Sequence, residues 1–241
     1  MSYDLNEKSI KLVELANTWQ GEGNDTGRQM LIVRFKHCNM RCSFCDTIIK
    51  MNSSIEGSFS INDINNALEK TKALMITGGE PSYSNPEKGI NNLEQTVAML
   101  KYCDYQTFNI ETNGCNLEEL IFEFQRTMNT RNADDCGSWK GSISYSPKIF
   151  NQVSYDIELE KVKKFINKPF LFIKMVADGR ELSEKFIKEI SILTDDRGKI
   201  YLMPLGTSSE EIAKNWEYCV NLADECNVNI STRMHIMHSF T

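Results

Sequence analysis

Three closely spaced cysteines are the residues of this chain best suited to chemistry. Cys38, Cys42 and Cys45 follow the spacing Cys-x3-Cys-x2-Cys, and they can converge on one small object only if the backbone loops around it. Soft thiolate ligands select zinc, copper(I) or an iron–sulfur cluster. A structural zinc or a closed ferredoxin cluster takes four protein ligands, so three cysteines leave one metal with an open coordination position. A substrate could bind there.

Two other interpretations of the cysteines have to be weighed. They could be buried thiols packed as small hydrophobes, but Asn39, Arg41 and Asp46 lie among them and would make a poor core segment. They could also bind zinc with His37 as the fourth ligand. Because His37 directly precedes Cys38, the two side chains are poorly placed to chelate one ion.

Length and composition predict a single domain, residues 1–241. The chain has 241 residues, 41% of them hydrophobic, which is enough for one large core. The formal net charge is −6, and no dense run of Lys or Arg is present, which argues against nucleic acid as a partner. Neither a signal peptide nor a stretch of eighteen apolar residues is present, so we expect a cytoplasmic protein with no membrane association. Eight cysteines in a reducing compartment are not a disulfide framework.

Strand-like and helix-like segments alternate along the chain. Short apolar runs predict strands, and apolar residues on one helical stripe predict helices. The predicted strands are Ile10–Ala16, Gln29–Lys36, Lys72–Thr77, Thr107–Ile110, Ser142–Tyr145, Phe170–Val176, Lys199–Met203 and Val228–Thr232. The predicted helices are one opened by Ser60, then Pro86–Cys103, Asn116–Met128, Asp156–Asn167, Arg180–Leu193 and Ser208–Cys226, with a loop over residues 130–141.

This alternation predicts an α/β fold, a partial (β/α)6-type TIM-like barrel with mostly parallel strands. Glycines, prolines and polar residues gather where the predicted strands end. Active sites of barrel folds lie at the carboxyl ends of the strands. We therefore expect the cysteine loop, which follows the strand Gln29–Lys36, to lie at such a face.

Four other segments at strand ends could bind a ligand. Gln20-Gly21-Glu22-Gly23 combines backbone that can approach closely with the amide and carboxylate groups that a heterocycle needs. Gly78-Gly79-Glu80-Pro81 could hold a cationic amino group through carbonyl oxygens and Glu80. Ser146-Pro147-Lys148 could hold a carboxylate or a ribose, and Met203-Pro204-Leu205-Gly206 ends another strand.

Arg34 is a charged residue inside an apolar strand. Such an arginine is costly unless it meets an anion, either a protein carboxylate or one that a ligand brings.

The cysteines and the Gly-Gly-Glu-Pro loop together resemble the radical S-adenosylmethionine (SAM) enzymes. The wider set of motifs resembles the 7-carboxy-7-deazaguanine synthase family over essentially the whole chain. This set consists of Gln20-Gly21-Glu22-Gly23, Arg34, Cys38 to Thr47, Thr77 to Pro81, Glu111-Thr112-Asn113-Gly114, Ser146-Pro147-Lys148 and Arg233-Met234-His235. Gln-Gly-Glu-Gly is the discriminating motif, because other radical SAM branches share the cysteines without it.

The resemblance implies a radical SAM fold and a carbon–nitrogen lyase reaction. The substrate would be 6-carboxy-5,6,7,8-tetrahydropterin, contracted with loss of ammonia to 7-carboxy-7-deazaguanine on the route to queuosine and other 7-deazapurines. The implied cofactors are a [4Fe–4S] cluster, SAM and Mg2+. The implied partners are an electron donor such as flavodoxin or ferredoxin and a second copy of the chain in a homodimer.

The resemblance also implies roles residue by residue. The cysteines would ligate the cluster, and Thr47 would bind Mg2+. The residues implied to hold SAM are Phe44, Asp46, Gly79, Glu80, Ser146, Lys148, Met203 and Pro204. The residues implied to bind the pterin are Trp19, Gln20, Gly21, Glu22, Arg34, Thr77 and His235, of which Gln20 and Arg34 join the cysteines as catalytic residues. His238 could take the role of His235, which follows the predicted terminal strand.

Two alternatives remain open at this point. A glycyl-radical-enzyme activase would share the SAM chemistry but act on a protein, and it would leave Gln20 to Gly23 and Arg34 unexplained. A zinc-bound or electron-transfer module would not be an enzyme at all.

Overall fold

The computed structural model describes residues 9–43, 45, 54–134, 140–194 and 196–238, and these residues gather into two compact units. The first unit contains the described residues of 1–18 and 29–142, and the second contains residues 19–28 and those described from 143 onward. The Gln-Gly-Glu-Gly segment thus belongs to the second unit, although both of its flanks in the sequence belong to the first. The single domain predicted from the sequence stays a prediction.

The first unit is built on parallel strands with buried, apolar residues. Within it β3 pairs in parallel with β5, and β5 pairs in parallel with β8, while β1 pairs with β4 in a small antiparallel sheet. Its strands are β1 (Ile10–Leu12), β2 (Glu14–Trp19, whose last residue lies in the second unit), β3 (Gln29–Arg34), β4 (Gly57–Phe59), β5 (Ala73–Thr77), β6 (Ser84–Asn85), β7 (Ile90–Asn91) and β8 (Thr107–Thr112). Every residue of β5 is buried, as expected for a central strand of a parallel sheet.

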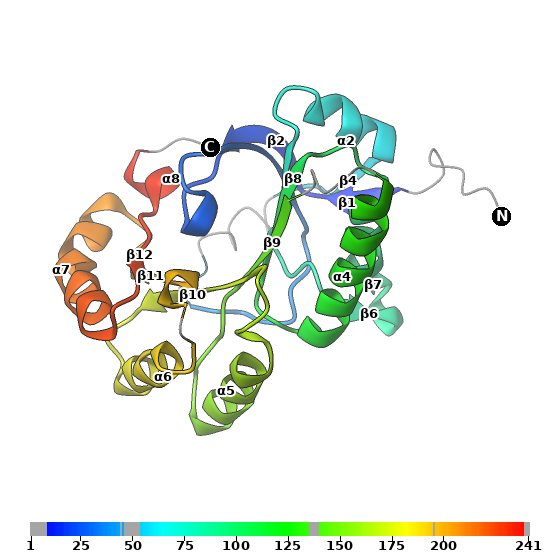
Figure 1. Cartoon of the computed structure of the whole chain (residues 1–241). Coiled ribbons are helices and arrows are strands. Elements are labelled where there is room, and N and C mark those ends of the chain that lie inside the picture. The colour runs from blue at the N-terminus through cyan, green and yellow to red at the C-terminus, as the bar shows by residue number, and fades with distance from the viewer. Residues whose placement is uncertain (1–8, 44, 46–53, 135–139, 195, 239–241) are drawn as a thin grey trace. The chain divides into compact units, whose positions relative to one another are not determined.

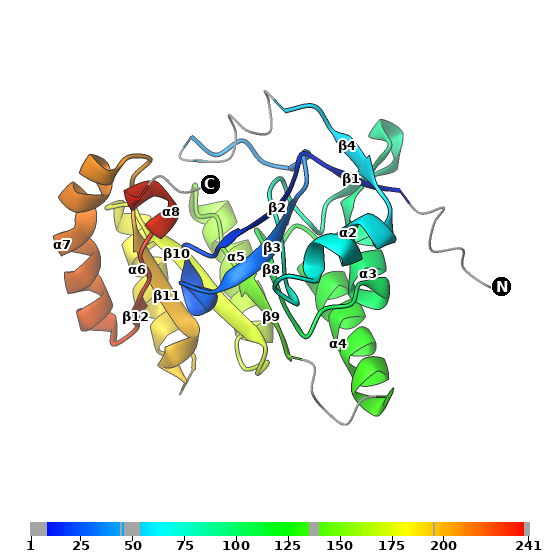
Figure 2. The same ribbon diagram turned by 90° about the horizontal axis from the view of Figure 1, so that it is seen from above.

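The described residues of the first unit form three α-helices. They are α2 (Ile61–Leu68), α3 (Asn92–Tyr102) and α4 (Leu117–Asp134). The α2 helix begins as the sequence predicts, because Ser60 and Asp63 form a reciprocal capping box. Figure 2 shows α3 and α4 side by side.

The second unit repeats the strand–helix alternation. Its strands are β9 (Lys140–Tyr145, whose first three residues lie in the first unit), β10 (Leu171–Ala177), β11 (Ile200–Pro204) and β12 (Asn229–Ile230). Its helices are α5 (Gln152–Phe165), α6 (Glu181–Ser191), α7 (Ser209–Cys226) and α8 (Met234–Met237). The strands β9, β10, β11 and β12 pair in parallel in that order. In Figure 1, α6 and α7 lie beside each other on the same side of β10 and β11.

The predicted α/β class with mostly parallel strands is confirmed, and the alternation is compatible with a partial (β/α)6-type barrel. Among the described residues, no helix has the length and apolar character needed to cross a bilayer. The described part of the chain also contains the 3-10 turns Gly23–Asp25, Pro86–Lys88 and Arg197–Lys199.

Several predicted boundaries were wrong. The run Ile10–Ala16 is divided after Leu12, because β1 pairs with β4 whereas β2 joins the sheet of β3. The helix predicted from Pro86 begins only at Asn92, since Gly89 takes the left-handed conformation (φ +63°) and ends a 3-10 turn. The predicted loop 130–141 starts later, because α4 continues to Asp134.

The terminal strand was also predicted too long. Only Asn229–Ile230 is a strand, and His235 lies in the short helix α8. The predicted strand Val228–Thr232 was therefore too long at both ends.

Candidate active site

The three cysteines lie on the loop between β3 and β4 of the first unit. Cys38, Cys42 and Cys45 are half-buried and form no disulfide. The Sγ of Cys38 accepts hydrogen bonds from the backbone N–H of Met40 at 3.4 Å and from Nδ2 of Asn113 at 3.6 Å. Burial is the main reason that the pKa of the Cys38 thiol is raised to about 11. Phe44, Asp46 and Thr47, for which SAM or Mg2+ binding is expected, are outside the described residues.

The cysteine loop fits an iron–sulfur cluster by two criteria. None of the three cysteines is in a disulfide, and N–H donors aimed at a cysteine sulfur are among the groups that tune such clusters. Among the described residues, no three His, Cys, Asp or Glu side chains gather around a single metal-ion position. A [4Fe–4S] cluster spreads its cysteine ligands over separate irons, so it does not require such a position. His37, the candidate fourth zinc ligand, has its Nε2 3.8 Å from Oε1 of Glu56.

A glycine allows the Gly-Gly-Glu-Pro loop to lie directly against the start of the cysteine loop. Gly79 has φ +45°, and a Cβ on it would lie 2.3 Å from the carbonyl oxygen of His37. The N–H of Glu80 donates to that carbonyl at 2.8 Å. Asn92 then joins the two loops, because its Nδ2 donates to the carbonyl oxygens of His37 at 3.0 Å and of Glu80 at 2.9 Å. The backbone of residues 78–80 is therefore fixed relative to Cys38.

The carboxylate of Glu80 is buried among neutral hydrogen-bond donors. Its Oε1 accepts from the N–H of Ser82 at 2.9 Å, from Oγ of Ser82 at 2.6 Å and from Oγ1 of Thr112 at 2.5 Å. Its Oε2 accepts from the N–H of Asn113 at 2.6 Å. Burial raises the pKa of Glu80 and outweighs these donors, which lower it. In the described structure this side chain organises the loops that follow β5 and β8.

Arg34 ends β3 and meets a protein carboxylate. Its Nε donates to Oε2 of Glu14 at 2.6 Å, and the side chain is only 12% exposed. The sequence left two possible partners for Arg34, a protein carboxylate or an anion from a ligand. In this structure Arg34 is paired with a protein carboxylate, that of Glu14. Thr77 on the neighbouring strand is the Cα partner of Arg34, and its Oγ1 donates to Oε2 of Glu111 at 2.8 Å.

In the second unit, the Gln-Gly-Glu-Gly segment forms a closed loop. The N–H of Gln20 donates to the carbonyl oxygen of Arg28, and the N–H of Gly27 donates to the carbonyl oxygen of Gln20, each at 2.8 Å. The Gln20 side chain is buried, and its Oε1 accepts from the N–H of Gly21 at 2.8 Å. Trp19, just before this loop, is half exposed.

Glu22 is the centre of a charged cluster within this unit. Its Oε2 lies 2.8 Å from Nζ of Lys174 on β10, and its Oε1 lies 3.0 Å from Nε of Arg233. Nε2 of His235 lies 3.6 Å from the same Oε1. Burial alone would raise the pKa of Glu22, but Lys174 first, and then Arg233 and His235, lower it well below the usual range. The two pKa shifts therefore have opposite directions: burial raises the pKa of Glu80, whereas the cations around Glu22 keep it a carboxylate.

The last described segment of the chain, residues 231–238, is hydrogen-bonded to the Gln-Gly-Glu-Gly loop. The N–H of Met234 donates to the carbonyl oxygen of Gly21 at 3.1 Å, and the N–H of Gly23 donates to Oγ of Ser231 at 2.6 Å. A Cβ on Gly21 would lie only 2.3 Å from Nδ1 of His235, so a larger residue does not fit there. His235 is thus brought to the Gln-Gly-Glu-Gly loop, whereas His238 is exposed.

Ser146 and Lys148 contact each other after β9, with Nζ of Lys148 donating to Oγ of Ser146 at 2.7 Å. Met203 and Pro204 are buried at the end of β11. The carbonyl oxygen of Gly206, just beyond them, accepts a hydrogen bond from Nη1 of Arg233. The end of β11 is therefore linked to the Glu22 cluster.

The structure divides the predicted site residues between the units. The first unit brings together Arg34, Cys38, Cys42, Cys45, Thr77, Gly79 and Glu80. The second unit contains Trp19, Gln20, Gly21, Glu22, Ser146, Lys148, Met203, Pro204 and His235.

Four polar residues that contact the expected site residues were given no role from the sequence: Glu14, Glu111, Lys174 and Arg233. Glu111 and Arg233 stand in motifs that carry the resemblance, whereas Glu14 and Lys174 were missed. Lys174 could have been found, because it interrupts an apolar strand in the same way as Arg34.

Comparisons with known proteins agree with the resemblance. A 7-carboxy-7-deazaguanine synthase from Pyrobaculum aerophilum is 23% identical over 231 residues, which cover 95% of this chain and 94% of the relative. One from Methanocaldococcus jannaschii is 27% identical over 205 residues, covering 78% and 77%. One from Haemophilus influenzae is 33% identical over 113 residues, covering 45% and 47%. No protein-family model matches the chain.

A solved structure shares the fold. The crystal structure of QueE from Escherichia coli matches with a TM-score of 0.57 at 19% identity, covering 95% of this chain and 96% of that chain. The resemblance predicted from the motifs is confirmed: over nearly its whole length this chain is similar to the 7-carboxy-7-deazaguanine synthases.

Proposed function

We propose that this chain is a radical SAM lyase that converts 6-carboxy-5,6,7,8-tetrahydropterin to 7-carboxy-7-deazaguanine with loss of ammonia. The observation that carries the proposal is the similarity to 7-carboxy-7-deazaguanine synthases across 95% of the chain. The arrangement of the predicted residues supports it, since the cysteine loop follows a parallel strand and the Gln-Gly-Glu-Gly loop carries a charged glutamate.

Cys38, Cys42 and Cys45 would hold a [4Fe–4S] cluster with one iron open to SAM. Such a cluster supplies the electron that cleaves SAM and so allows hydrogen to be taken from C6 of the pterin. Asn113 and the backbone of Met40 would remain N–H donors to the sulfur of Cys38, which tunes the cluster and fixes the loop.

The residues proposed to bind SAM combine backbone carbonyl groups with one cation. Gly79 and the adjoining carbonyls are fixed by His37 and Asn92, so they can accept hydrogen bonds from an amino group without rearrangement. Lys148, in contact with Ser146, offers an ammonium to a carboxylate. The other residues proposed for SAM are Phe44, Asp46, Glu80, Met203 and Pro204.

The residues proposed to bind the pterin supply complementary hydrogen-bonding groups. Glu22 is a fixed acceptor for the N–H groups of the heterocycle, with Trp19, Gln20, Gly21, Thr77 and His235 as further contacts. Arg34 would pair with the pterin carboxylate. A guanidinium has five N–H donors, so the bond from Nε to Glu14 leaves donors for a second carboxylate.

Further parts of the proposal rest on the resemblance alone. Thr47 would bind a Mg2+ ion, for which a hydroxyl oxygen is a suitable ligand. A flavodoxin or a ferredoxin would supply the electron, two copies of the chain would form a homodimer, and the reaction would take place in the cytoplasm.

The test uses protein purified and reconstituted without oxygen. With SAM, a strong reductant and the carboxylated pterin, we expect 5′-deoxyadenosine and 7-carboxy-7-deazaguanine by mass spectrometry. The Cys42→Ala variant should lose both products together with its iron. SAM cleavage without any deazaguanine would reject the proposal in favour of a glycyl-radical activase. Zinc as the only bound metal would reject both enzymes.

A further inference from the structure

Lys174 is a buried lysine in the middle of an apolar strand. It is 6% exposed, it lies in β10 between Ile173 and Met175, and its Cα partner on β11 is Tyr201. A lysine in such a place loses its hydration, which is costly unless a carboxylate compensates. Nζ of Lys174 meets Oε2 of Glu22 at 2.8 Å, a residue 152 positions away in the sequence.

Among the described residues, three basic side chains surround the Glu22 carboxylate. Neutralising Glu22 needs one cation, yet both Lys174 and Arg233 contact its carboxylate and His235 lies nearby. Replacing a buried ion pair by apolar residues of similar volume is often neutral or stabilising. Stability alone therefore does not explain why two buried cations surround one carboxylate.

The two cations contact the carboxylate from two different parts of the fold. Lys174 holds Oε2 from β10, and Arg233 holds Oε1 from the segment after β12 while also donating to the carbonyl oxygen of Gly206. An ionised carboxylate has about four acceptor positions, so one bond on each oxygen leaves acceptor positions on both. A pterin presents neighbouring N–H donors that match two such oxygens. A carboxylate that is already fixed loses little entropy when it accepts them.

We infer that Lys174 is a positioning residue that, together with Arg233, fixes the Glu22 carboxylate for two N–H donors of the pterin ring. The inference rests on the proposed function. It adds a specific role for a strand residue that does not itself need to touch the substrate. Lys174 thereby becomes a determinant of affinity for heterocycles of the guanine type.

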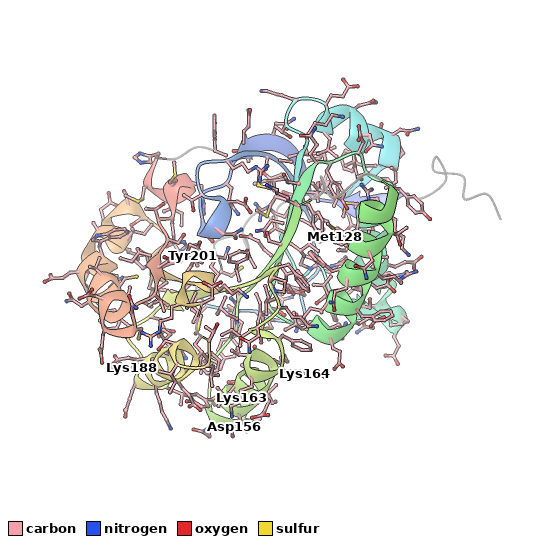
Figure 3. All side chains as sticks on the ribbon, viewed as in Figure 1. Met128, Asp156, Lys163, Lys164, Lys188 and Tyr201 are labelled. Carbon is pink, nitrogen blue, oxygen red and sulfur yellow. The ribbon has the colours of Figure 1, made fainter. Side chains whose placement is uncertain are left out.

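The experiment compares three variants of the reconstituted protein. Lys174→Met removes the charge and keeps the length of the side chain, and Lys174→Arg keeps the charge. Lys163→Met is the matched control, since Lys163 is 43% exposed on the outer side of α5, where it pairs with Glu160 (Figure 3). The measurements are kcat and KM for the pterin from pH 5 to pH 8, and SAM cleavage without the pterin.

We expect K174M to lose affinity for the pterin and to keep its SAM cleavage activity. For K174M we expect the KM for the pterin to rise about a hundredfold, as a small misplacement of a binding group can cause. SAM cleavage without the pterin should equal that of K163M, and K174R should recover most of the loss. The K174M profile should also gain a decline in kcat/KM towards acidic pH. Without Lys174, the pKa of Glu22 rises, and only Arg233 and His235 still oppose its protonation.

The same KM for K174M and K163M would overturn the inference. So would a pH profile of K174M that matches that of the wild type, because a merely structural lysine would not change it. If K174M does not fold, the double variant E22Q/K174M removes both charges and decides the question, since pterin binding like that of the wild type would contradict the role. Failure of the proposed function can be told apart from failure of the role inferred for Lys174. It would be seen in the wild-type protein as SAM cleavage without deazaguanine, and the inference would fall with it.

Discussion

Two buried glutamates, one in each unit, are held in opposite ways. Glu80 of the first unit is surrounded by hydroxyl and amide donors, and burial raises its pKa. Glu22 of the second unit is surrounded by Lys174, Arg233 and His235, which lower its pKa against the effect of burial. The same residue type therefore serves two purposes. Neutral donors make a carboxylate part of the loop architecture, and cations make it a permanent negative charge.

The difference corresponds to the chemistry proposed for each unit. The first unit has to fix loops around a metal cluster, and the Glu80 network connects the loops after β5 and β8 beside Cys38. The second unit is proposed to offer hydrogen-bond acceptors to a heterocycle, a role that the charged Glu22 would fill. The following predictions test this contrast, beginning with the largest expected effect.

Glu22→Ala should be the most damaging of the glutamate substitutions. It leaves Lys174 and Arg233 buried without their carboxylate, and removing one partner of a buried ion pair costs about 3–5 kcal/mol of unfolding free energy. Chemical denaturation measures the loss. The double variant E22A/K174M should regain part of the loss. A stability of E22A equal to that of the wild type would mean that the cations do not depend on Glu22.

Glu80→Ala should lower the unfolding free energy by less, about 2–3 kcal/mol. It leaves neutral hydrogen-bond donors without their acceptor, whereas Glu22→Ala leaves charged groups without theirs. Denaturation of E80A beside E22A gives the comparison directly. The contrast between the two units would be broken if E80A were the less stable variant.

Gly21→Ala tests the fastening of the last described segment to the Gln-Gly-Glu-Gly loop. The new Cβ would lie 2.3 Å from Nδ1 of His235 and 2.9 Å from its backbone nitrogen, and overpacking of this kind costs about 1–3 kcal/mol. Pterin affinity should fall as well. Gly198→Ala in the same unit is the control, since the nearest atom to its Cβ is the side-chain Oδ1 of Asp196 at 3.1 Å. Equal stability of both variants would show that His235 is not fixed by this contact.

The pH dependence of stability should have opposite signs for the two glutamates. The folded-state pKa of Glu22 is below its ordinary value, so its contribution is present above that value and is lost as the pH falls towards the folded-state pKa. The folded-state pKa of Glu80 is raised, so its protonated form favours the folded state and stability declines as the pH rises past the ordinary value.

Unfolding measured from pH 3 to pH 7 checks these signs. Each titration contributes a slope of at most about 1.4 kcal/mol per pH unit. The variant E22Q should lose less stability than the wild type on acidification, and E80Q should gain relative to the wild type as the pH rises. The same sign for both variants would contradict the comparison.

The strand pattern and the motifs that carry the family resemblance could be predicted from the sequence, because both depend on residues close together in the chain. Ligand binding by those motifs stays a prediction. Boundaries failed where partners distant in sequence decide, as at β1, which pairs with β4 about 47 residues away, and at Gly89, whose left-handed backbone delays α3. No residue pattern within Ile10–Ala16 indicates that this segment is divided between two sheets.

The candidate site shows the same limit. The residues expected to bind ligands were found by their motifs, but the groups that hold them are 20 to 211 positions away, as Glu14 is from Arg34 and Arg233 is from Glu22. A charged residue in an apolar strand is a signal that a partner exists, as at Arg34 and Lys174. It does not say which partner, because that depends on the fold.

The most direct test of the proposed reaction follows the hydrogen that is removed from the substrate. The wild-type protein, reconstituted with iron and sulfide, is given SAM, a reductant and pterin deuterated at C6, and the 5′-deoxyadenosine is analysed by mass spectrometry. We predict deuterium in the 5′-deoxyadenosine together with 7-carboxy-7-deazaguanine. Unlabelled 5′-deoxyadenosine and an unchanged pterin would contradict the account.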